Sequence, residues 1–245
     1  GMWAGGPGSQ FAGLKFGQDT GTYFREEIEF PFFEKHLRGV NAGEIAEATV
    51  FETGANKWHK LSVWPPKVKL VPWYLGGDKR LSLARPAKES VLKYTADPAA
   101  PTPYEPNYKT SRRRPSSYMA ADQTFAAQRN DVLTFRSEPL TSDVHAAGPI
   151  WAKINFKTTG TDADIVVKLI DEYPADASTL TELDKELAGK LVMVRGNVMR
   201  AKFRKSMESP SPLSPGKVES VNFNLNETMH TFRKGHRVVV QVQSY

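Results

Sequence analysis

The residues of this chain that could do chemistry include five histidines, which are scattered along the sequence. None of them belongs to an H-E-x-x-H pattern, which would place two imidazoles on one helical face for a metal ion. His230 and His236 flank a short turn and could meet across a hairpin, either in a metal-binding or catalytic role or in a packing role. Because the metal-ligand spacing is missing, we favour the packing role.

Two aspartates form a second candidate site. Asp162 and Asp164 stand two positions apart, so on a strand they would share one face. Their carboxylates could then offer oxygen ligands to a calcium ion. The alternative, which we favour, is a turn at residues 159–162 that is closed by an Asx hydrogen bond.

The segment from residue 97 to residue 129 is rich in proline and polar residues and is too long for a simple turn. Loops of this length are usually functional or wrap across a neighbouring domain. A group of its side chains could therefore form one wall of a substrate pocket or pack between domains. These pocket-wall candidates are Tyr118, Met119, Asp122, Gln123 and Phe125.

Nucleophilic catalysis has no motif in this sequence. An α/β-hydrolase places its serine on a strained strand-to-helix elbow, written G-x-S-x-G, and no serine here satisfies that pattern. The complete absence of cysteine removes disulfides, zinc–thiolate sites, iron–sulfur clusters and cysteine nucleophiles together. We therefore expect no catalytic residue and no cofactor in this chain.

The overall composition is that of an ordinary globular protein. At 245 residues with 40% hydrophobic content, the chain can form one large β domain or two smaller ones. The net charge of +6 is mild, and the basic run at residues 112–114 lacks interleaved aromatic residues, so we expect no nucleic-acid partner. No stretch approaches the ~20 apolar residues of a membrane span, and we expect no membrane partner.

The elements that must position these candidates change in type along the chain. Residues 19–37 carry aromatic and aliphatic side chains roughly on one side, which predicts an amphipathic helix with a kink at Pro31 and Gly39 as its C-terminal cap. Residues 48–53 predict a short strand. From residue 67 onward, strand-like segments without alternating helices favour an antiparallel sandwich. These segments are residues 150–157, 164–171, 191–203, 218–225 and 237–243.

Several of these segments resemble one family of hydrolases, in order and over nearly the whole chain. The run SEPLTSDVHAAGPIWAKINFKTTGTDADIVVKLIDEYP begins at residue 137, and VRGNVMRAKFRKS and FRKGHRVVVQVQS begin at residues 194 and 232. Upstream, FGQDTGTYFREEIEFPFFEKHLRG and VFETGANKWHKLSVWPP begin at residues 16 and 50. These segments resemble the C-terminal region of the glutaryl acylase, α-amino acid ester hydrolase and cocaine esterase group. X-Pro dipeptidyl-peptidases share that domain.

The resemblance implies a mainly β fold. It places a jelly-roll, galactose-binding-like β-sandwich at residues 67–245, truncated at its C-terminal end. It assigns residues 1–66 to the end of an α/β-hydrolase domain, with its last helix and strand. The serine, aspartate and histidine of such enzymes belong to the part of the family pattern that precedes Trp3, so none of the triad transfers to a residue here.

The resemblance implies an accessory domain that caps and shapes the acyl-binding site of a serine hydrolase and is inactive alone. The partner would be a companion hydrolase domain or chain. The alternative function is a free-standing jelly-roll binding module, most plausibly for carbohydrate, which an exposed aromatic stripe on one sheet face would support. Such relatives are often exported, but no signal in the sequence fixes the compartment.

Self-association is a further expectation. An incomplete sandwich would leave residues 237–244 as an unpaired edge strand, which is a template for pairing with another chain. The helix at residues 19–37 would also expose aromatic side chains that a complete hydrolase domain covers. We therefore expect copies of this chain to associate by edge pairing, by swapping or by burial of that helix.

Overall fold

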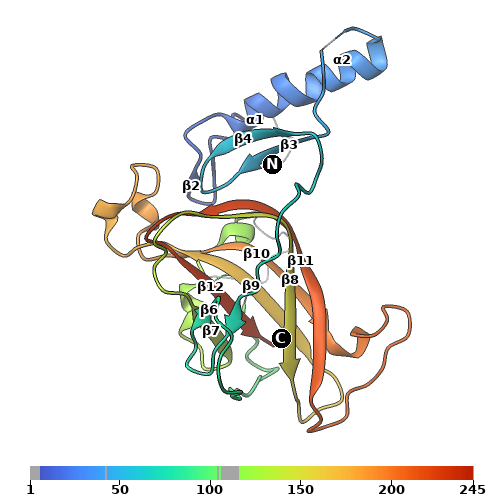
Figure 1. Ribbon diagram of the computed structural model, residues 1–245, viewed down its shortest axis with the longest axis vertical. Coiled ribbons are helices and arrows are strands. Elements are labelled where there is room, and N and C mark those ends of the chain that lie inside the picture. The colour runs from blue at the N-terminus through green and yellow to red at the C-terminus, as the bar shows by residue number, and fades with distance from the viewer. Residues whose placement is uncertain (1–5, 42, 104, 106–115, 245) are drawn as a thin grey trace.

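Strand-forming sequence dominates from residue 132 onward and builds two antiparallel sheets (Figure 1). The structure is a computed structural model that describes residues 6–41, 43–103, 105 and 116–244. The mainly β, antiparallel fold expected from the sequence is confirmed. The larger sheet has the order β10 (Leu191–Arg200), β9 (Asp164–Glu172), β12 (Arg237–Gln243), β7 (Val132–Arg136), and the smaller pairs β11 (Glu219–Phe232) with β8 (Val144–Phe156).

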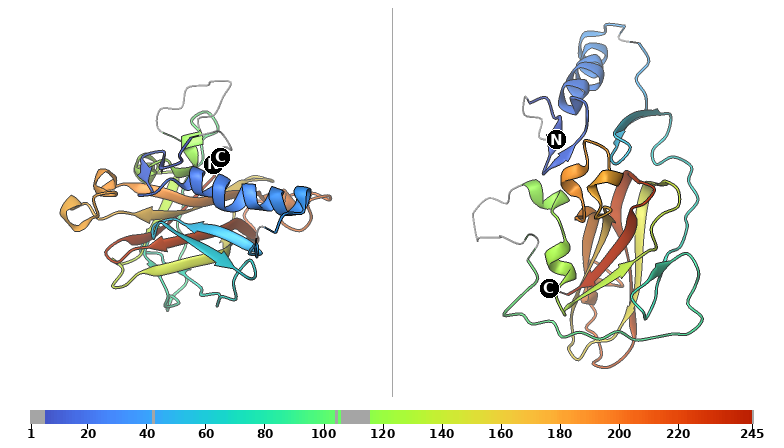
Figure 2. Two further views of the ribbon diagram at one scale, coloured as in Figure 1. Left: turned by 90° about the horizontal axis from the view of Figure 1, so that it is seen from above. Right: turned by 90° about the vertical axis from the view of Figure 1, so that its left-hand side faces the viewer.

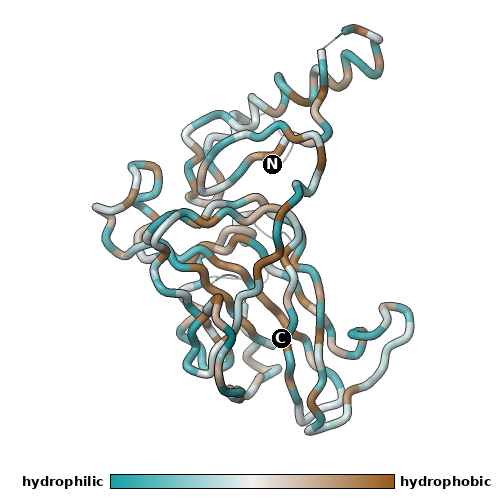
Figure 3. The backbone as a smooth tube through the Cα atoms, viewed as in Figure 1, coloured by the Kyte–Doolittle hydropathy of each residue, from teal (hydrophilic) through white to brown (hydrophobic). Residues whose placement is uncertain are grey.

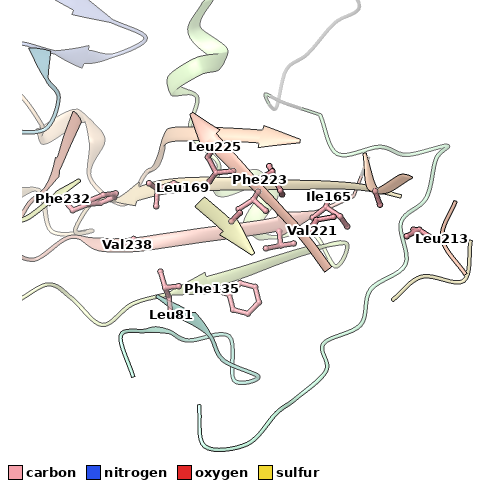
Figure 4. Close-up of a cluster of buried hydrophobic side chains, with 14 residues drawn as sticks. Leu81, Phe135, Ile165, Leu169, Leu213, Val221, Phe223, Leu225, Phe232 and Val238 are labelled. Atoms are coloured by element: carbon pink, nitrogen blue, oxygen red, sulfur yellow. The ribbon is translucent and has the colours of Figure 1, made fainter. Parts of the chain in front are cut away.

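The hydrophobic core lies between these sheets (Figure 4). Residues two apart on a strand point to the same face, so alternate side chains of each strand enter the core. Burial of such a side chain contributes about 1.5–3 kcal/mol relative to leaving it exposed. The core residues from the two facing strands β9 and β11 are Ile165, Val167, Leu169, Val221, Phe223, Leu225 and Phe232.

Strand β12 occupies the middle of the larger sheet. Its residues pair with β9 on one side and with β7 on the other, both antiparallel. The expectation of an unpaired edge at residues 237–244 is therefore wrong. The sequence did not predict strand β7, which follows the long loop directly and pairs with β12. Val238 and Val242 enter the core, whereas Val239 is buried on the outer face.

The outer face of the larger sheet is covered by the second half of the long loop, from residue 116 onward (Figure 2). This cover contains a 3₁₀ turn, η2 (Ser116–Ala120), and a short helix, α3 (Thr124–Ala127). Ala127 packs against Ile170, Leu191 and Val239, so this face of the sheet has a second apolar layer. The basic run at residues 112–114 lies outside the described residues.

The N-terminal segment folds as a helix beside two small hairpins. The helical stretch consists of α1 (Thr20–Tyr23), a π-helical segment η1 (Phe24–Glu29) and α2 (Phe30–Arg38). The π-helical segment ends two residues before Pro31, which has no N–H to donate and whose ring would collide with an α-helical carbonyl. Gly39 ends the helix in the left-handed conformation (φ 66°), as the sequence predicted.

The hairpin of β3 (Ala48–Glu52) and β4 (Lys57–Leu61) joins this helix to the sandwich. The Tyr23 ring stacks on Trp58 with centroids 4.5 Å apart, and Trp58 also contacts Phe51. Farther along the helical stretch, no residue of α2 is buried among the described residues: Phe30 is 62% exposed and Leu37 is 76% exposed. This bears out the expectation that the helix exposes aromatic side chains.

Shorter elements complete the described chain. Hydrophobic residues concentrate along the strands of the sandwich rather than in any long helix (Figure 3). Among the described residues, no helix is both long and apolar enough to cross a bilayer. The remaining strands are β1 (Gln10–Phe11), β2 (Leu14–Lys15), β5 (Tyr74–Leu75) and β6 (Leu81–Ser82), and the 3₁₀ turns are η3 (Ala177–Thr179), η4 (Lys185–Leu187) and η5 (Ala201–Phe203).

Candidate functional site at the junction of hairpin and sandwich

Four of the five histidines gather on two carboxylates where the β3–β4 hairpin meets the sandwich. The first carboxylate is Asp171 of β9, which is 1% exposed. His236 Nδ1 lies 2.9 Å from one of its oxygens and His230 Nε2 lies 3.2 Å from the other. The two histidines predicted to meet across a hairpin therefore meet through a shared aspartate, one on each oxygen.

The second carboxylate is Glu52, at the end of β3 and 4% exposed. His59 Nε2 of β4 lies 2.7 Å from one oxygen, and His145 Nδ1 of β8 lies 2.8 Å from the other. The hydroxyl of Thr231, the residue next to His230, also donates a hydrogen bond to Glu52. Glu52 thus connects the hairpin to both strands of the smaller sheet.

Backbone hydrogen bonds join the two carboxylate clusters. Thr53 N donates to Met229 O at 3.1 Å, and Thr231 N donates to Thr53 O at 2.9 Å. Gly54 follows with φ 81°, and a Cβ on it would lie 2.1 Å from Thr231 O. Only glycine allows these two segments of the backbone to approach each other this closely. The end of β3 is therefore fixed to β11 by main chain and side chains together.

Hydrogen bonding decides the ionisation of both carboxylates. Burial alone would raise the pKa of Asp171, but the hydrogen bonds and positive charge of His230 and His236 hold that pKa below its ordinary value. Burial would likewise raise the pKa of Glu52, and the bonds from Thr231, His145 and His59 lower it. Both groups are therefore ionised at neutral pH, where each binds its two imidazoles.

One part of this network has the order hydroxyl, imidazole, carboxylate that serine hydrolases use. Thr53 Oγ1 lies 2.8 Å from His230 Nδ1, whose other ring nitrogen faces Asp171. The cavity beside Thr53 and His230 measures ≈ 40 Å³. Ligand pockets usually measure about 300–1,000 Å³, so this space is too small for an acyl substrate. The arrangement is suited to holding the hairpin in place.

Two of the pocket-wall candidates are anchored inside the cover of the larger sheet. Asp122 Oδ1 accepts hydrogen bonds from Thr124 N at 3.0 Å and from Leu191 N at 3.0 Å, so it closes an Asx turn before α3 and ties this turn to β10. Gln123 is fully buried, and its Oε1 accepts from Lys168 Nζ at 2.7 Å.

The other three pocket-wall candidates lie nearer the surface of the cover. Met119 is 46% exposed, and Tyr118 and Phe125 are half-buried. Neither the ≈ 40 Å³ cavity nor an open depression of ≈ 490 Å³ beside residues 9–19 is lined by any of the five. The structure therefore brings these residues together on one cover, and neither of these two hollows includes them.

The calcium candidates lie at the start of β9. Asp162 Oδ2 accepts from Arg200 Nε at 2.8 Å and lies 3.6 Å from Lys202 Nζ. Burial would raise the pKa of Asp162, but the bond from Arg200 and two backbone N–H groups lower it. Its carboxylate is thus engaged by two cations, while Asp164 begins the strand. No group of three or more acidic or histidine side chains in the described ranges is arranged to hold a metal ion.

The aromatic stripe that would favour carbohydrate binding does not form on the described sheet faces. Trp151 of β8 is 55% exposed, and the other exposed aromatic side chains within the described ranges lie on α2. A single exposed tryptophan is common on protein surfaces and does not form a stripe. The structure therefore gives this alternative function no specific support.

Sequence reasoning missed most of the junction site. Glu52, Asp171 and their partners come from five different strands and from the turn that precedes β12. The bonded pairs Asp171–His230 and Thr231–Glu52 are 59 and 179 residues apart. No local spacing signals such pairs. The only available signal was the short interval between His230 and His236, which indicated their proximity but not the aspartate between them.

Comparison with known proteins agrees with this description. Residues 45–245 match the family described as X-Pro dipeptidyl-peptidase C-terminal non-catalytic domain. The cocaine esterase of Rhodococcus sp. (strain MB1 Bresler) is 28% identical over 226 residues, which cover 87% of this chain and 37% of that esterase.

Two solved structures are similar over 97% of this chain, each with a TM-score of 0.89 and 33% sequence identity. One is an aminopeptidase from a marine sediment archaeon, Thaumarchaeota archaeon, of which 39% is covered. The other is an α-amino acid ester hydrolase, of which 40% is covered. The chain therefore spans about two fifths of the length of the proteins that it matches.

The fold and these matches define a non-catalytic C-terminal β-sandwich domain of the kind found in such hydrolases. The chain belongs to the X-Pro dipeptidyl-peptidase C-terminal non-catalytic domain family.

Proposed function

We propose that this chain is the accessory part of a serine hydrolase that transfers acyl groups of esters or amides to water. Support comes from the family match and from the names of the relatives: an esterase, an ester hydrolase and an aminopeptidase. The relatives are more than twice as long as this chain, which leaves room in them for a separate hydrolase domain. In this proposal, residues 1–66 continue that domain and residues 67–245 form the accessory sandwich.

The observation that carries the proposal is the exposed apolar side of α2. Phe30, Phe33 and Leu37 are spaced by three and four residues, so they form one stripe, which we call the aromatic helix face. They are 62%, 48% and 76% exposed. Contiguous exposed apolar surface of this kind marks an interaction site. We propose that the companion hydrolase domain covers this face.

The junction site gives the aromatic helix face a fixed position. Tyr23 stacks on Trp58 of the β3–β4 hairpin, and the same hairpin holds Glu52 and its histidines. A hydrolase domain bound to the helix would therefore be held at a defined place relative to the sandwich. We propose that this rigidity, rather than chemistry, is the role of the buried histidines and carboxylates.

The cover of the larger sheet is our proposed contribution to the acyl-binding site. In this proposal Tyr118, Met119 and Phe125 form part of the pocket wall, while Asp122 and Gln123 anchor it. Their positions on one cover and the exposure of Met119 support this assignment. The second wall would come from the companion domain.

A chimera tests the proposal. The C-terminal two fifths of the α-amino acid ester hydrolase relative would be replaced by this chain, and ester hydrolysis would be measured. We expect the chimera to be active. When Phe30 and Phe33 become serine, the hydrolase domain should no longer pack on the aromatic helix face. When Tyr118 and Met119 become alanine, the KM values for different acyl groups should change. A matched control, Lys153→Ala on the exposed side of β8, should leave both unchanged. Unaltered assembly after Phe30→Ser/Phe33→Ser would contradict the docking role, and unaltered selectivity after Tyr118→Ala/Met119→Ala would contradict the wall.

A further inference from the structure

A row of buried polar side chains crosses the outer face of the larger sheet, beneath the cover. Thr134 of β7, Gln241 of β12 and Lys168 of β9 lie directly opposite one another in the strand register. They are 5%, 0% and 7% exposed. An antiparallel sheet usually buries apolar residues on a covered face, so a polar row at this place requires a reason.

Gly196 of β10 ends the row and makes room for the lysine. It lies opposite Lys168, and a Cβ on it would lie 3.4 Å from Lys168 Cγ and 3.3 Å from Val167 O. The aliphatic stem of Lys168 therefore runs close over the glycine. A larger residue at position 196 would crowd this stem and shift the ammonium group at its end.

The ammonium group reaches the cover through one residue. Lys168 Nζ donates to Gln123 Oε1 at 2.7 Å, and Gln241 Nε2 donates to Gln123 O at 3.3 Å. Gln123 N donates in turn to Leu191 O at 2.7 Å. Gln123 is thus bound to β9, β12 and β10, and together with Asp122 it fastens the cover to the sheet.

Stability alone does not account for a lysine at this position. The elements packed around it contribute the uncharged Gln241, Gly196 and Gln123, and no ion pair to Lys168 occurs among the described residues. Burial accordingly lowers the pKa of its amine to about 8. An unpaired buried cation is costly, and a methionine would fill similar space without that cost. What the lysine adds is its hydrogen bond to Gln123.

We propose that Lys168 is a positioning residue: through its bond to Gln123 it fixes the cover at residues 118–125, and so the pocket wall, over the larger sheet. The part about the pocket wall rests on the function proposed above. The part about the cover concerns this chain alone and can be tested without an enzyme.

Hydrogen exchange of the full 245-residue chain tests the first part. Lys168→Met and Gln123→Met break the same bond from opposite ends, and Lys153→Met is the matched control on an exposed strand position. We expect exchange in residues 118–127 to accelerate at least tenfold in each single variant, with little further change in the double variant. Exchange in β8 and β11 should stay the same in all of them.

The denaturation midpoint at pH 7 separates positioning from general support of the fold. Because Lys168→Met removes a buried charge, we expect its midpoint in urea to be unchanged or higher while the cover exchanges faster. Unaltered exchange in the cover, or faster exchange throughout the chain together with a lower midpoint, would overturn the proposal. Gln123→Met keeps the test open if the lysine variant does not fold.

The chimera described above tests the second part. In it, Lys168→Met should change KM for bulky acyl groups with little change in kcat for the smallest one. Faster exchange of the cover with an unchanged KM profile would leave the positioning of the cover supported and overturn the pocket-wall function. An unchanged exchange rate would overturn the positioning itself, whatever the chimera shows.

Discussion

Two regions of this chain carry similar aromatic side chains and bury them to very different degrees. In the sandwich, Phe135, Phe223 and Phe232 are 4%, 5% and 2% exposed. On α2 of the N-terminal segment, Phe30 and Phe33 are 62% and 48% exposed. The three phenylalanines of the sandwich belong to the core between its sheets, whereas no residue of α2 is buried. The difference indicates that the sandwich stabilises itself and that the helix offers a surface.

The largest effect that tests this comparison comes from matched phenylalanine substitutions. Phe232→Ala should lower the free energy of unfolding by about 3–5 kcal/mol, because it opens a cavity in the packed core. Phe33→Ala should change it by no more than about 0.5 kcal/mol, since the ring is already half in water. Urea denaturation followed by circular dichroism measures both. Equal losses in the two variants would remove the distinction between the regions.

A substitution at the junction between the two regions should lower the free energy of unfolding nearly as much as one in the core. In Asp171→Asn the amide group can accept from one histidine only, and its NH₂ group faces the other. We expect a loss of about 3 kcal/mol at pH 7, the size seen when one partner of a buried charged network is removed. Glu182→Gln, at an exposed position, is the control. A loss below about 0.5 kcal/mol would show that the junction does not hold the hairpin.

Acid should weaken the same junction. The pKa values of Asp171 and Glu52 are lowered in the folded chain. Their contribution to stability is therefore present above the unfolded values near pH 4 and is lost as the pH falls through the lower folded values. We expect the unfolding free energy of the wild type to fall more steeply below pH 4 than that of Asp171→Asn. Parallel curves would contradict the ionised state assigned to Asp171.

The pH dependence at Lys168 should have the same direction, but at alkaline pH. The pKa of its amine is about 8 when folded and 10.5 in its ordinary state. Between these values the unfolded chain binds more protons, so stability rises with pH. From pH 7 to pH 10.5, the wild type should gain on Lys168→Met by at most about 3 kcal/mol. A constant difference between the two proteins over this range would argue against a buried amine.

Substitutions on the aromatic helix face should have the smallest effect on stability, although their effect on self-association should be large. We expect the isolated chain to self-associate at micromolar concentration through this face, because no described segment covers it. Phe30→Ser/Phe33→Ser should reduce the sedimentation coefficient to that of a monomer while the denaturation midpoint changes little. A wild-type chain that is monomeric at micromolar concentration would contradict this prediction.

Local sequence patterns predicted the individual helices and strands of this fold better than they predicted which strands pair with one another. The alternation in residues 150–157 and the glycine after residue 38 identified strand β8 and the end of α2, because both signals are contained within a few residues. Strand β7 was missed, and with it the central place of β12, since pairing between strands more than 100 residues apart leaves no local trace. The junction site was missed for the same reason: its carboxylates and imidazoles come together only when β3, β8, β9 and β11 have met.

The most direct test of the account is an activity measurement on the purified 245-residue chain. Hydrolysis of p-nitrophenyl esters and of a glutaryl anilide would be followed alongside labelling by a fluorophosphonate probe, with the α-amino acid ester hydrolase relative as the active control. A non-catalytic accessory domain predicts no turnover above the uncatalysed rate and no labelled serine. Turnover together with labelling of a serine in this chain would contradict the account.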